Sequence, residues 1–353
     1  MTFLRPTDDA LATTAALRRW LDAARPDPLL IETSGSTAAP KRVLLSRDAV
    51  LASAAATTNR LGGEGAWAVR LPTSYVAGVQ TLVRSLVAGA EPISDGWQGA
   101  RFTSLVPTQL LRLLESPDDV AALRDLDAVL LGGGPIDASL RERAEDAGIR
   151  IVATYGSSET AGGCVYDGYP LDGVGLIIGA DGRIRLGGPT LFDGYEGDPE
   201  MTASSLVDGW FLTSDHGRLD EDGRIQVLGR LDDVIVSGGV NIPAGVVASR
   251  LREHPSVRAA EVVGADDPEW GRIVVAVVSL SRHKSTRESR PPGTNARGID
   301  ADRAQMPALD ELRAWVAETH PRSWAPRKLL VLDEIPLLPN GKPDRRTLEE
   351  MAQ

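Results

Sequence analysis

The sequence contains a single cysteine, Cys164, among its 353 residues. One cysteine excludes an internal disulfide and any zinc site built from several cysteines, which favours a reducing compartment. No apolar run approaches the roughly 18 residues that a membrane-spanning helix needs, and residues 1–6 lack the apolar core of a signal peptide. We therefore expect a cytoplasmic protein without a membrane span.

Basic residues are also fewer than acidic ones: the chain has 38 Lys and Arg and 49 Asp and Glu, which gives a net charge of -11. This balance argues against nucleic acid or an anionic membrane as a partner, and any anionic ligand needs a local positive site. Hydrophobic and charged residues make up 42% and 25% of the chain, which are ordinary globular values that exclude disorder. The length allows two domains with a sizeable core.

A loop rich in hydroxyl groups follows the apolar run Leu29–Thr33, which we interpret as a buried strand. The loop residues suited to phosphate oxygens are Thr33, Ser34, Gly35, Ser36, Thr37 and Lys41. Glycine permits a tight turn in which amides and hydroxyls converge on phosphate, and lysine adds a compact positive charge. The spacing differs from that of the common nucleoside-triphosphatase loop. The alternative is a solvated linker.

Strand and helix patterns alternate between residues 48 and 154. This alternation predicts an α/β fold with a mostly parallel, doubly wound sheet and ligands at its strand ends. A helix capped by Thr7 is expected before it, over residues 8–24. After about Pro170, short strands with glycine turns predict a small β subdomain, and a compact α+β tail follows residues 229–233.

Six motifs occur in order along the chain. They are the loop 33–41, Tyr155-Gly156-Ser157-Ser158-Glu159-Thr160, Gly187-Gly188-Pro189 with Gly194-Tyr195, Trp210–Asp215, Gly229–Asp233 and Pro339–Lys342. Each is weak alone, but in this order they resemble the adenylate-forming superfamily of acyl-CoA synthetases from Ile31 to Leu348. Ala38 and Ser158 depart from that family's loop glycine and threonine. The resemblance implies ATP, Mg2+, CoA and a small carboxylic acid as ligands.

The resemblance also implies which residues bind ATP. They are Thr33, Ser34, Gly35, Ser36, Thr37, Lys41, Gly133, Gly134, Tyr155, Gly156, Ser158, Asp215 and Arg230. Tyr155 offers a flat face for adenine, and Asp215 can accept hydrogen bonds from the ribose hydroxyls. Glu159 is the expected Mg2+ ligand, since this cation prefers carboxylate and phosphate oxygens. Without the other motifs, Tyr155 would more often be a core aromatic, and Glu159 a carboxylate in the first turn of a helix.

Lys342 is, by resemblance, the catalytic lysine that bridges the acid's carboxylate and the α-phosphate as charge develops. The alternative is an exposed lysine in a turn. The resemblance implies a large domain over residues 1–229, shortened at its N-terminus, a hinge over 230–232 at Asp232, and a small mobile domain over 233–353. CoA is expected at Ser237, Gly238 and Gly239.

Three features of the tail depart from the family or from globular texture. Val236 stands where a lysine is common, and Gly245 lies in place of an acidic motif. Hinge and CoA contacts are therefore expected to differ in detail. Residues 281–306 carry few apolar side chains in their first half, and we interpret them as a flexible surface insertion.

The acid is predicted from the stretch after Pro72. Tyr75 occupies the family's position beside the acyl carboxylate, and Arg84 follows nine residues later among apolar neighbours. A buried arginine needs an anionic partner, either a second substrate carboxylate or an internal acid such as Glu91 or Asp95. A basic residue at this place is found in the o-succinylbenzoyl-CoA synthetases, which the chain resembles, especially their short actinobacterial forms.

Small residues after Glu159 complete the expected acid pocket. Gly163 leaves room for a benzoate ring, and Cys164 is interpreted as a pocket-lining residue rather than a nucleophile. The resemblance implies ATP-dependent conversion of o-succinylbenzoate to its CoA thioester in menaquinone biosynthesis. The alternatives are a CoA ligase for benzoate or salicylate and a nucleotide-binding homologue without turnover. A homo-oligomer is left open.

Overall fold

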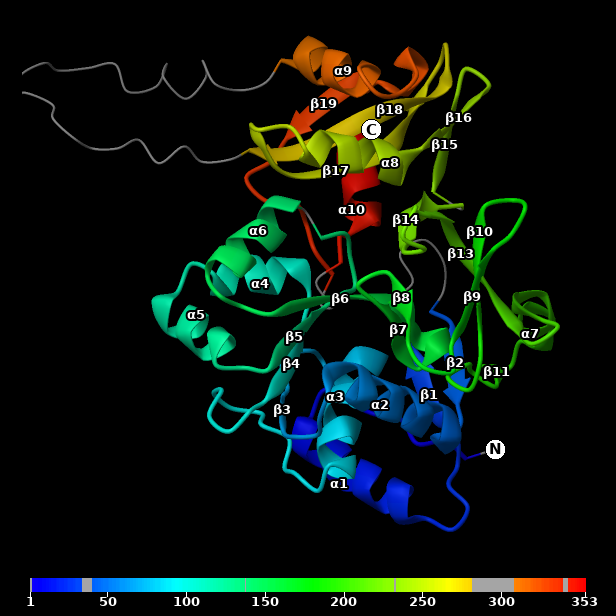
Figure 1. The fold of residues 1–353 in the computed structure, drawn as a ribbon. Coiled ribbons are helices and arrows are strands. Elements are labelled where there is room, and N and C mark those ends of the chain that lie inside the picture. The colour runs from blue at the N-terminus through cyan, green and yellow to red at the C-terminus, as the bar shows by residue number, and fades with distance from the viewer. Residues whose placement is uncertain (1, 34–39, 137, 232, 281–307, 339–341) are drawn as a thin grey trace, which may run out of the picture. The chain divides into compact units, whose positions relative to one another are not determined.

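The computed structural model describes residues 2–33, 40–136, 138–231, 233–280, 308–338 and 342–353 (Figure 1). The predicted phosphate contacts Ser34, Gly35, Ser36 and Thr37, the hinge residue Asp232 and the insertion 281–306 lie outside these ranges. The chain divides into two compact units, Met1–Leu228 with Leu337–Lys342 and Gly229–Pro336 with Pro343–Gln353. None of the helices in the described ranges is long and apolar enough to cross a membrane.

The larger unit contains a six-stranded sheet in the order β3-β4-β5-β6-β7-β8. Its strands are β3 (Trp67–Ala68), β4 (Phe102–Leu105), β5 (Ala128–Leu131), β6 (Ile151–Ser157), β7 (Gly162–Tyr166) and β8 (Tyr169–Pro170). The first four are parallel, whereas β7 and β8 each run antiparallel to the preceding strand. The predicted mostly parallel α/β sheet is thus confirmed.

Helices cover both faces of this sheet, as Figure 1 shows. They are α2 (Arg47–Leu61) and α3 (Val76–Val87) on one face and α4 (Pro107–Leu113), α5 (Pro117–Arg124) and α6 (Ala138–Asp146) on the other. Alternation along β5 explains this arrangement, since successive side chains point to opposite faces of a strand. Leu130 packs in the cluster that contains Ala56 of α2, whereas Val129 and Leu131 pack with helices α4 to α6.

The N-terminal helix α1 (Ala10–Asp22) is shorter than the predicted range 8–24, and the predicted cap was wrong. Asp9 is the N-cap residue, because its carboxylate accepts a hydrogen bond from the amide of Ala12 at 3.0 Å. Thr7 instead donates its amide to the hydroxyl of Thr13 at 3.0 Å. Both residue types favour a cap, so the choice depended on where the first turn begins.

A separate antiparallel sheet frames the predicted phosphate loop. Its order is β1 (Leu29–Glu32), β2 (Arg42–Leu45) and β11 (Gly194–Tyr195). Leu29 pairs with Leu45 and Glu32 with Arg42, so the loop connects the two strands of a hairpin. The loop therefore does not follow a strand of the parallel sheet.

The predicted β subdomain is confirmed as a five-stranded sheet in the order β12-β13-β10-β9, with β14 beside β13. Its strands are β9 (Gly175–Ile178), β10 (Arg183–Gly187), β12 (Leu206–Val207), β13 (Trp210–Leu219) and β14 (Ile225–Arg230). Helix α7 (Pro199–Ser205) leads into β12.

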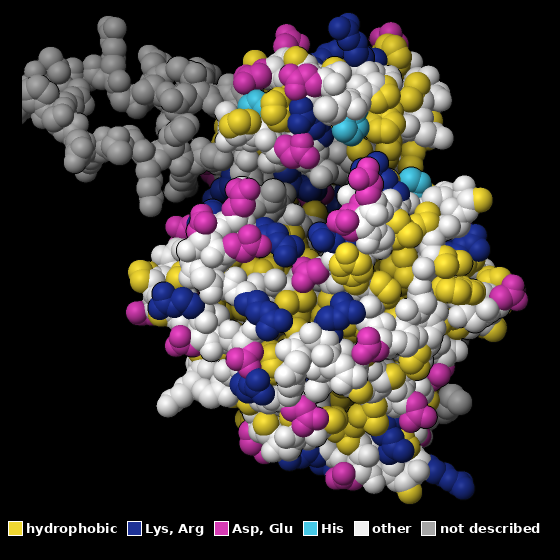
Figure 2. Space-filling model, viewed as in Figure 1, with side chains coloured by type: hydrophobic (Ala, Val, Ile, Leu, Met, Phe, Trp, Pro, Cys, Tyr) yellow, Lys and Arg dark blue, Asp and Glu magenta, His cyan; other side chains and the backbone are white. Residues whose placement is uncertain are grey.

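On the face of the molecule in Figure 2, acidic and basic side chains are interspersed.

The smaller unit is α+β. Its central sheet is β17 (Val257–Asp267), β18 (Gly271–Leu280) and β19 (Lys328–Val331), with a hairpin of β15 (Val234–Ser237) and β16 (Val240–Pro243). Alternate residues of β17 and β18 pack on α8 (Ala244–Arg252) and α9 (Leu309–Ala317), or on α10 (Arg345–Ala352). Val262 belongs to the first cluster and Val263 to the second, so each strand is buried on both faces.

Candidate active site

The two ends of the predicted phosphate loop are held together by backbone pairing. The amide of Thr33 donates to the carbonyl of Lys41 at 2.9 Å, and the amide of Lys41 donates to the Thr33 hydroxyl at 3.1 Å. Hence Thr33 and Lys41 lie side by side although eight positions separate them. The Lys41 ammonium lies 5.2 Å from the centre of the Tyr195 ring, a cation–π distance that directs its charge toward β11.

The predicted Mg2+ ligand Glu159 lies in a single helical turn, η1 (Ser158–Thr160), with Ser158 at its start. Glu159 is 7% exposed, and its carboxylate accepts a hydrogen bond from the Tyr195 hydroxyl at 2.9 Å. Burial, with the Glu159 carboxylate as a second cause, raises the pKa of Tyr195, so its hydroxyl remains a donor near neutral pH. The contact fixes one carboxylate oxygen, and no hydrogen bond from a described side chain reaches the other.

Tyr195 had no site role in the sequence predictions, although its motif Gly194-Tyr195 was noted. The structure brings Lys41, Glu159 and Tyr195 together because β11 pairs with β2, where Tyr195 is opposite Val43. The motif itself was the available signal. Its partner could not be inferred, since 36 positions separate Tyr195 from Glu159.

The donor set fits magnesium held mainly by substrate phosphates. The described residues contain no cluster of three or more His, Cys, Asp or Glu side chains that could hold a metal by themselves. Mg2+ commonly takes one or two carboxylates and completes its shell with phosphate oxygens and water. Glu159 is a buried carboxylate of this kind, and through Tyr195 it lies near Lys41 at one end of the predicted phosphate loop.

Tyr155 and Asp215 meet at the predicted adenosine site. The Tyr155 hydroxyl donates to a carboxylate oxygen of Asp215 at 2.7 Å, linking β6 to β13. The amide of Asp215 donates to the Thr213 hydroxyl at 3.1 Å, which orients the carboxylate. Burial, and next the Asp215 charge, raises the pKa of Tyr155, so the phenol stays protonated. An aromatic face and an oriented carboxylate are therefore adjacent, as nucleoside binding requires.

Gly156 and Gly133 favour glycine for two different reasons, close backbone packing at the first and a positive φ at the second. A Cβ atom on Gly156 would lie 2.2 Å from the Gly162 carbonyl oxygen, so no larger residue fits between β6 and β7. Gly133 has a φ of +82°, which favours glycine. At Gly134 an added Cβ would meet no atom within 4 Å, so the space beside this predicted ATP contact is open.

The predicted acid-binding residues lie on α3 as expected. Tyr75 is the N-cap residue of this helix, and Arg84 lies in its third turn. A Cβ on Gly78 would lie 2.1 Å from the Pro72 carbonyl oxygen, which explains the glycine six residues after that proline. The stretch Gly78–Ser85 is buried on every side, so Arg84 enters the core of the larger unit.

Arg84 is only 6% exposed, and its guanidinium lies 4.8 Å from the centre of the Trp67 ring. Among the described residues, no carboxylate oxygen lies within 4.0 Å of it, and its Nε has no hydrogen-bond acceptor. Burial lowers the pKa of Arg84, and Tyr166 partly offsets this effect. The suggested internal partner Glu91 is instead paired with Arg18. The buried guanidinium therefore has Trp67 and Tyr166 as neighbours, and no described carboxylate neutralises its charge.

The small residues after Glu159 are more tightly packed than expected. A Cβ on Gly163 would lie 3.1 Å from the Thr154 Cβ and 3.2 Å from the Tyr166 ring, so protein atoms occupy this space. Cys164 is fully buried, and burial raises the pKa of its thiol to about 12. The thiolate is thus scarce at neutral pH, in agreement with a packing role.

In the smaller unit, the predicted CoA residues form the tip of the β15–β16 hairpin. Gly238 and Gly239 have φ values of +56° and +80°, a pair typical of a tight two-residue hairpin turn. The amide of Gly238 donates to the carbonyl of Trp270 at 2.9 Å, and an added Cβ would lie 2.6 Å from that indole ring. Ser237 is buried beside this turn, and Arg230 ends β14.

Lys342 lies at the end of a short excursion from the smaller unit. The amide of Asp344 donates to the carbonyl of Pro336 at 2.9 Å, which closes the base of the excursion. Within it, the amide of Leu338 donates to the carbonyl of Lys342 at 2.8 Å. This excursion, Leu337–Lys342, is assigned to the larger unit, whereas Pro336 before it and Pro343 after it belong to the smaller one.

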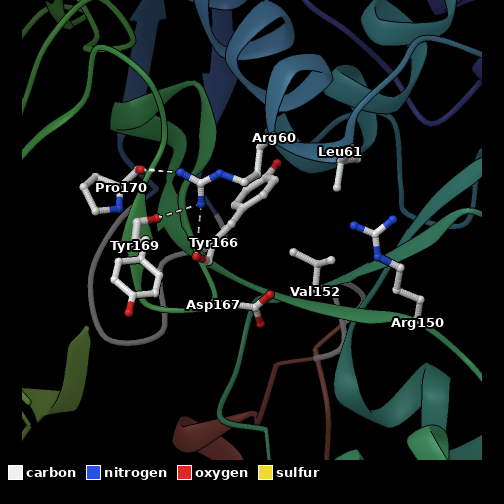
Figure 3. A pocket seen from close by; sticks show the side chains of 8 residues that line it. All are labelled: Arg60, Leu61, Arg150, Val152, Tyr166, Asp167, Tyr169 and Pro170. Atoms are coloured by element: carbon white, nitrogen blue, oxygen red, sulfur yellow. Dashed lines mark hydrogen bonds between the residues drawn. The ribbon is translucent and has the colours of Figure 1, made fainter. Parts of the chain in front are cut away.

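A cavity of about 620 Å³ opens elsewhere on the larger unit (Figure 3). It is lined by Arg60, Leu61, Arg150, Val152, Tyr166, Asp167, Tyr169 and Pro170. The Arg60 guanidinium donates to the carbonyl of Pro170 at 2.6 Å and to those of Tyr166 and Tyr169 at 3.4 Å. None of the predicted site residues lines this cavity. The Arg60 guanidinium is already hydrogen-bonded to three backbone carbonyls.

Comparison with known proteins identifies relatives along most of the chain. Residues 22–191 match the AMP-binding enzyme family, and residues 247–342 match the AMP-binding enzyme C-terminal domain. Over 339 residues the chain is 41% identical to a probable 2-succinylbenzoate–CoA ligase of Mycobacterium tuberculosis (strain CDC 1551 / Oshkosh). That match covers 91% of this chain and 83% of the relative.

Two solved structures of o-succinylbenzoate-CoA synthetase from Bacillus subtilis are also similar. The complex with the acyl-adenylate intermediate is 27% identical, with a TM-score of 0.71, over 91% of this chain and 68% of that one. The complex with ATP and magnesium is 28% identical, with a TM-score of 0.70, over 91% and 69%. The order of motifs, the fold and these relatives agree.

Proposed function

The chain belongs to the family of AMP-binding enzymes, and from that membership we propose that it ligates 2-succinylbenzoate to coenzyme A with ATP. The reaction is AMP-forming and passes through an acyl-adenylate, the intermediate bound in a similar structure. The observation that carries the choice of acid is the buried Arg84, which has no carboxylate partner among the described residues and suits a substrate with a second carboxylate. In this proposal the product serves menaquinone biosynthesis.

The first half-reaction joins the acid to AMP. A carboxylate oxygen of the acid bonds to the α-phosphorus of ATP, and the bond from that phosphorus to the bridging oxygen breaks to release pyrophosphate. Thr33, Lys41 and the loop between them hold phosphates, Tyr155 and Asp215 hold adenosine, and Lys342 stabilises the developing charge. Glu159 would hold magnesium, which when bound would neutralise charge on the phosphates.

The second half-reaction transfers the acyl group to sulfur. The CoA thiol loses its proton and bonds to the acyl carbon, while the bond from that carbon to the phosphate oxygen breaks and AMP departs. Ser237, Gly238 and Gly239 lie beside the slender pantetheine arm in this proposal. The amide of Gly238 is already bonded to Trp270, but the space beside Gly239 is open, since an added Cβ there would meet no atom within 4 Å.

The remaining predicted positions complete the proposed site. They are the ATP contacts Ser34, Gly35, Ser36, Thr37, Gly133, Gly134, Gly156, Ser158 and Arg230, the acid contacts Tyr75 and Gly163, and the hinge Asp232. Because ATP and CoA are cytoplasmic metabolites, the protein is proposed to act in the cytoplasm.

The test is an assay of the purified chain with ATP, Mg2+, CoA and a panel of acids, with mass detection of the thioester. The proposal expects thioester and AMP with 2-succinylbenzoate and little product with benzoate or salicylate. Preference for a simple aryl acid would favour that alternative. Nucleotide binding without AMP release for any acid would identify a homologue without turnover.

Replacing Arg84 separates function from stability. Arg84→Met removes a buried charge that no described carboxylate neutralises, so we expect the free energy of unfolding to rise by about 1 kcal/mol. Loss of a charge-assisted contact of about 1.5–3 kcal/mol should lower kcat/KM for 2-succinylbenzoate roughly ten- to hundredfold. Denaturant unfolding and steady-state kinetics measure the two effects.

The matched control is Arg70→Met. Arg70 also stacks on an indole, 4.2 Å from the centre of the Trp97 ring, but it donates to the carbonyl of Val69 at 2.9 Å. Its loss should destabilise the fold without changing the preference among acids. Equal acid selectivity in wild type and Arg84→Met would refute the assignment of Arg84.

Two orientations of the small domain are expected to serve the two half-reactions, with Asp232 as the pivot. Proline fixes φ near −65° and removes an amide proton. Asp232→Pro should therefore arrest the exchange and leave one half-reaction active while the other is lost, whereas Asp232→Ala retains both. Pyrophosphate release and thioester formation from preformed acyl-adenylate measure them separately. Wild-type rates for both in Asp232→Pro would contradict the mechanism.

A further inference from the structure

Arg345 connects two stretches of the smaller unit that are 112 positions apart in the sequence. It is the first residue of α10, and its guanidinium pairs with the carboxylate of Asp233. The same guanidinium donates to the carbonyl of Val262 at 3.1 Å and lies 3.6 Å from a carboxylate oxygen of Glu261. The three charged side chains are 17%, 18% and 13% exposed, so solvent screens the contacts weakly.

Each end of this connection adjoins a residue of the proposed mechanism. Asp233 follows the hinge residue Asp232 directly, and Arg345 follows Lys342 by three positions. The carbonyl of Asp233 accepts a hydrogen bond from Ala244 at 3.1 Å, which ties it to the start of α8. On the other side, Asp344 caps α10 by accepting from the amide of Thr347 at 3.2 Å.

We propose that Arg345 is a positioning residue that makes the hinge and the Lys342 excursion move as one block. Rotation about Asp232 can place Lys342 accurately only if the excursion keeps a constant position relative to the hinge. A planar guanidinium with several donors is suited to this, because it holds a carboxylate and a carbonyl in fixed directions. The inference rests on the proposed function, since it assumes that Lys342 acts in adenylation.

The contacts of Arg345 should affect adenylation and not thioester formation. The CoA hairpin is held by its own strand pairing and by Trp270, so it does not need Arg345. A misplacement of about 1 Å can cost up to roughly a hundredfold in rate, which sets the scale for adenylation. Thioester formation from preformed acyl-adenylate should stay near the wild-type rate.

The most informative variant is Arg345→Lys, which keeps the positive charge but loses the planar guanidinium and its several donors. It also avoids the danger in Arg345→Met, which leaves Asp233 and Glu261 buried with less positive charge and can prevent folding. Arg346→Ala is the matched control, because the Arg346 side chain is 84% exposed and pairs with Glu350 one helical turn on. Arg345→Lys should lower pyrophosphate release about tenfold or more, and Arg346→Ala should leave it unchanged.

A second comparison distinguishes positioning from general structural support. In a Lys342→Ala background there is no lysine left to place, so Arg345→Lys should cause no further loss of adenylation. Hydrogen exchange at the amides of residues 336–344 should be faster in Arg345→Lys than in Arg346→Ala. This second measurement does not depend on ligase activity.

The proposal is overturned if Arg345→Lys adenylates at the wild-type rate, or if it lowers the rates of both half-reactions equally. It is also overturned if Arg345→Lys lowers the adenylation rate of the Lys342→Ala variant by a further factor. Unchanged exchange at residues 336–344 would also overturn it. If the wild-type protein forms no acyl-adenylate with any acid, the proposed function fails, whereas the exchange measurement still decides whether Arg345 holds the excursion.

Discussion

Lys342→Ala is expected to lower the rate of acyl-adenylate formation by a hundredfold or more while thioester formation from preformed acyl-adenylate persists. The lysine acts while negative charge develops between the acid's carboxylate and the α-phosphate. Loss of one preorganised donor at such a site typically costs about 2.7–4 kcal/mol of barrier. Pyrophosphate release measures the first step, and mass detection of the thioester measures the second.

The two half-reactions serve as each other's control in this experiment. If Lys342→Ala loses both steps by the same factor, Lys342 has been given the wrong role. Lys342→Arg provides a further comparison, because it retains the charge but changes its shape and reach. We expect it to recover part of the adenylation rate, since the electrostatic contribution survives in part.

Glu159→Gln should have a comparable effect on adenylation and should also change its magnesium dependence. The substitution keeps the size of the side chain and its hydrogen bond from Tyr195 but removes the charge of the proposed magnesium ligand. We expect a loss of roughly a hundredfold in rate, and half-maximal activity at a higher Mg2+ concentration. Titration of pyrophosphate release with Mg2+ measures both.

Glu32→Gln is the matched control for the carboxylate. Glu32 ends β1 beside the phosphate hairpin, but its side chain is 57% exposed and only loosely paired with Arg42 at 3.9 Å. Its loss should leave the Mg2+ titration unchanged.

Tyr195→Phe removes the partner that orients Glu159. Loss of such a partner usually lowers metal affinity or activity by about ten- to hundredfold. An unchanged Mg2+ titration in Glu159→Gln would exclude this residue as the ligand.

The sequence by itself was sufficient to predict features that depend on near neighbours along the chain. Alternating strand and helix patterns predicted the parallel sheet, since burial periodicity is a local property. Glycine-bounded strands predicted the β subdomain, and the apolar neighbours of Arg84 predicted that it is buried. Motif order identified the family for the same reason.

Only the tertiary structure decided which distant residues meet. The two ends of the predicted phosphate loop belong to antiparallel strands, because β2 pairs with β1 and also with β11, and that pairing brings Tyr195 to Glu159. Likewise, Arg84 was predicted to need an anion, but its lack of a described carboxylate partner became evident only from the fold. The contact between Arg345 and Asp233 spans 112 positions, and no local periodicity encodes it. Such contacts follow from strand order and helix packing, which depend on the whole chain folding at once.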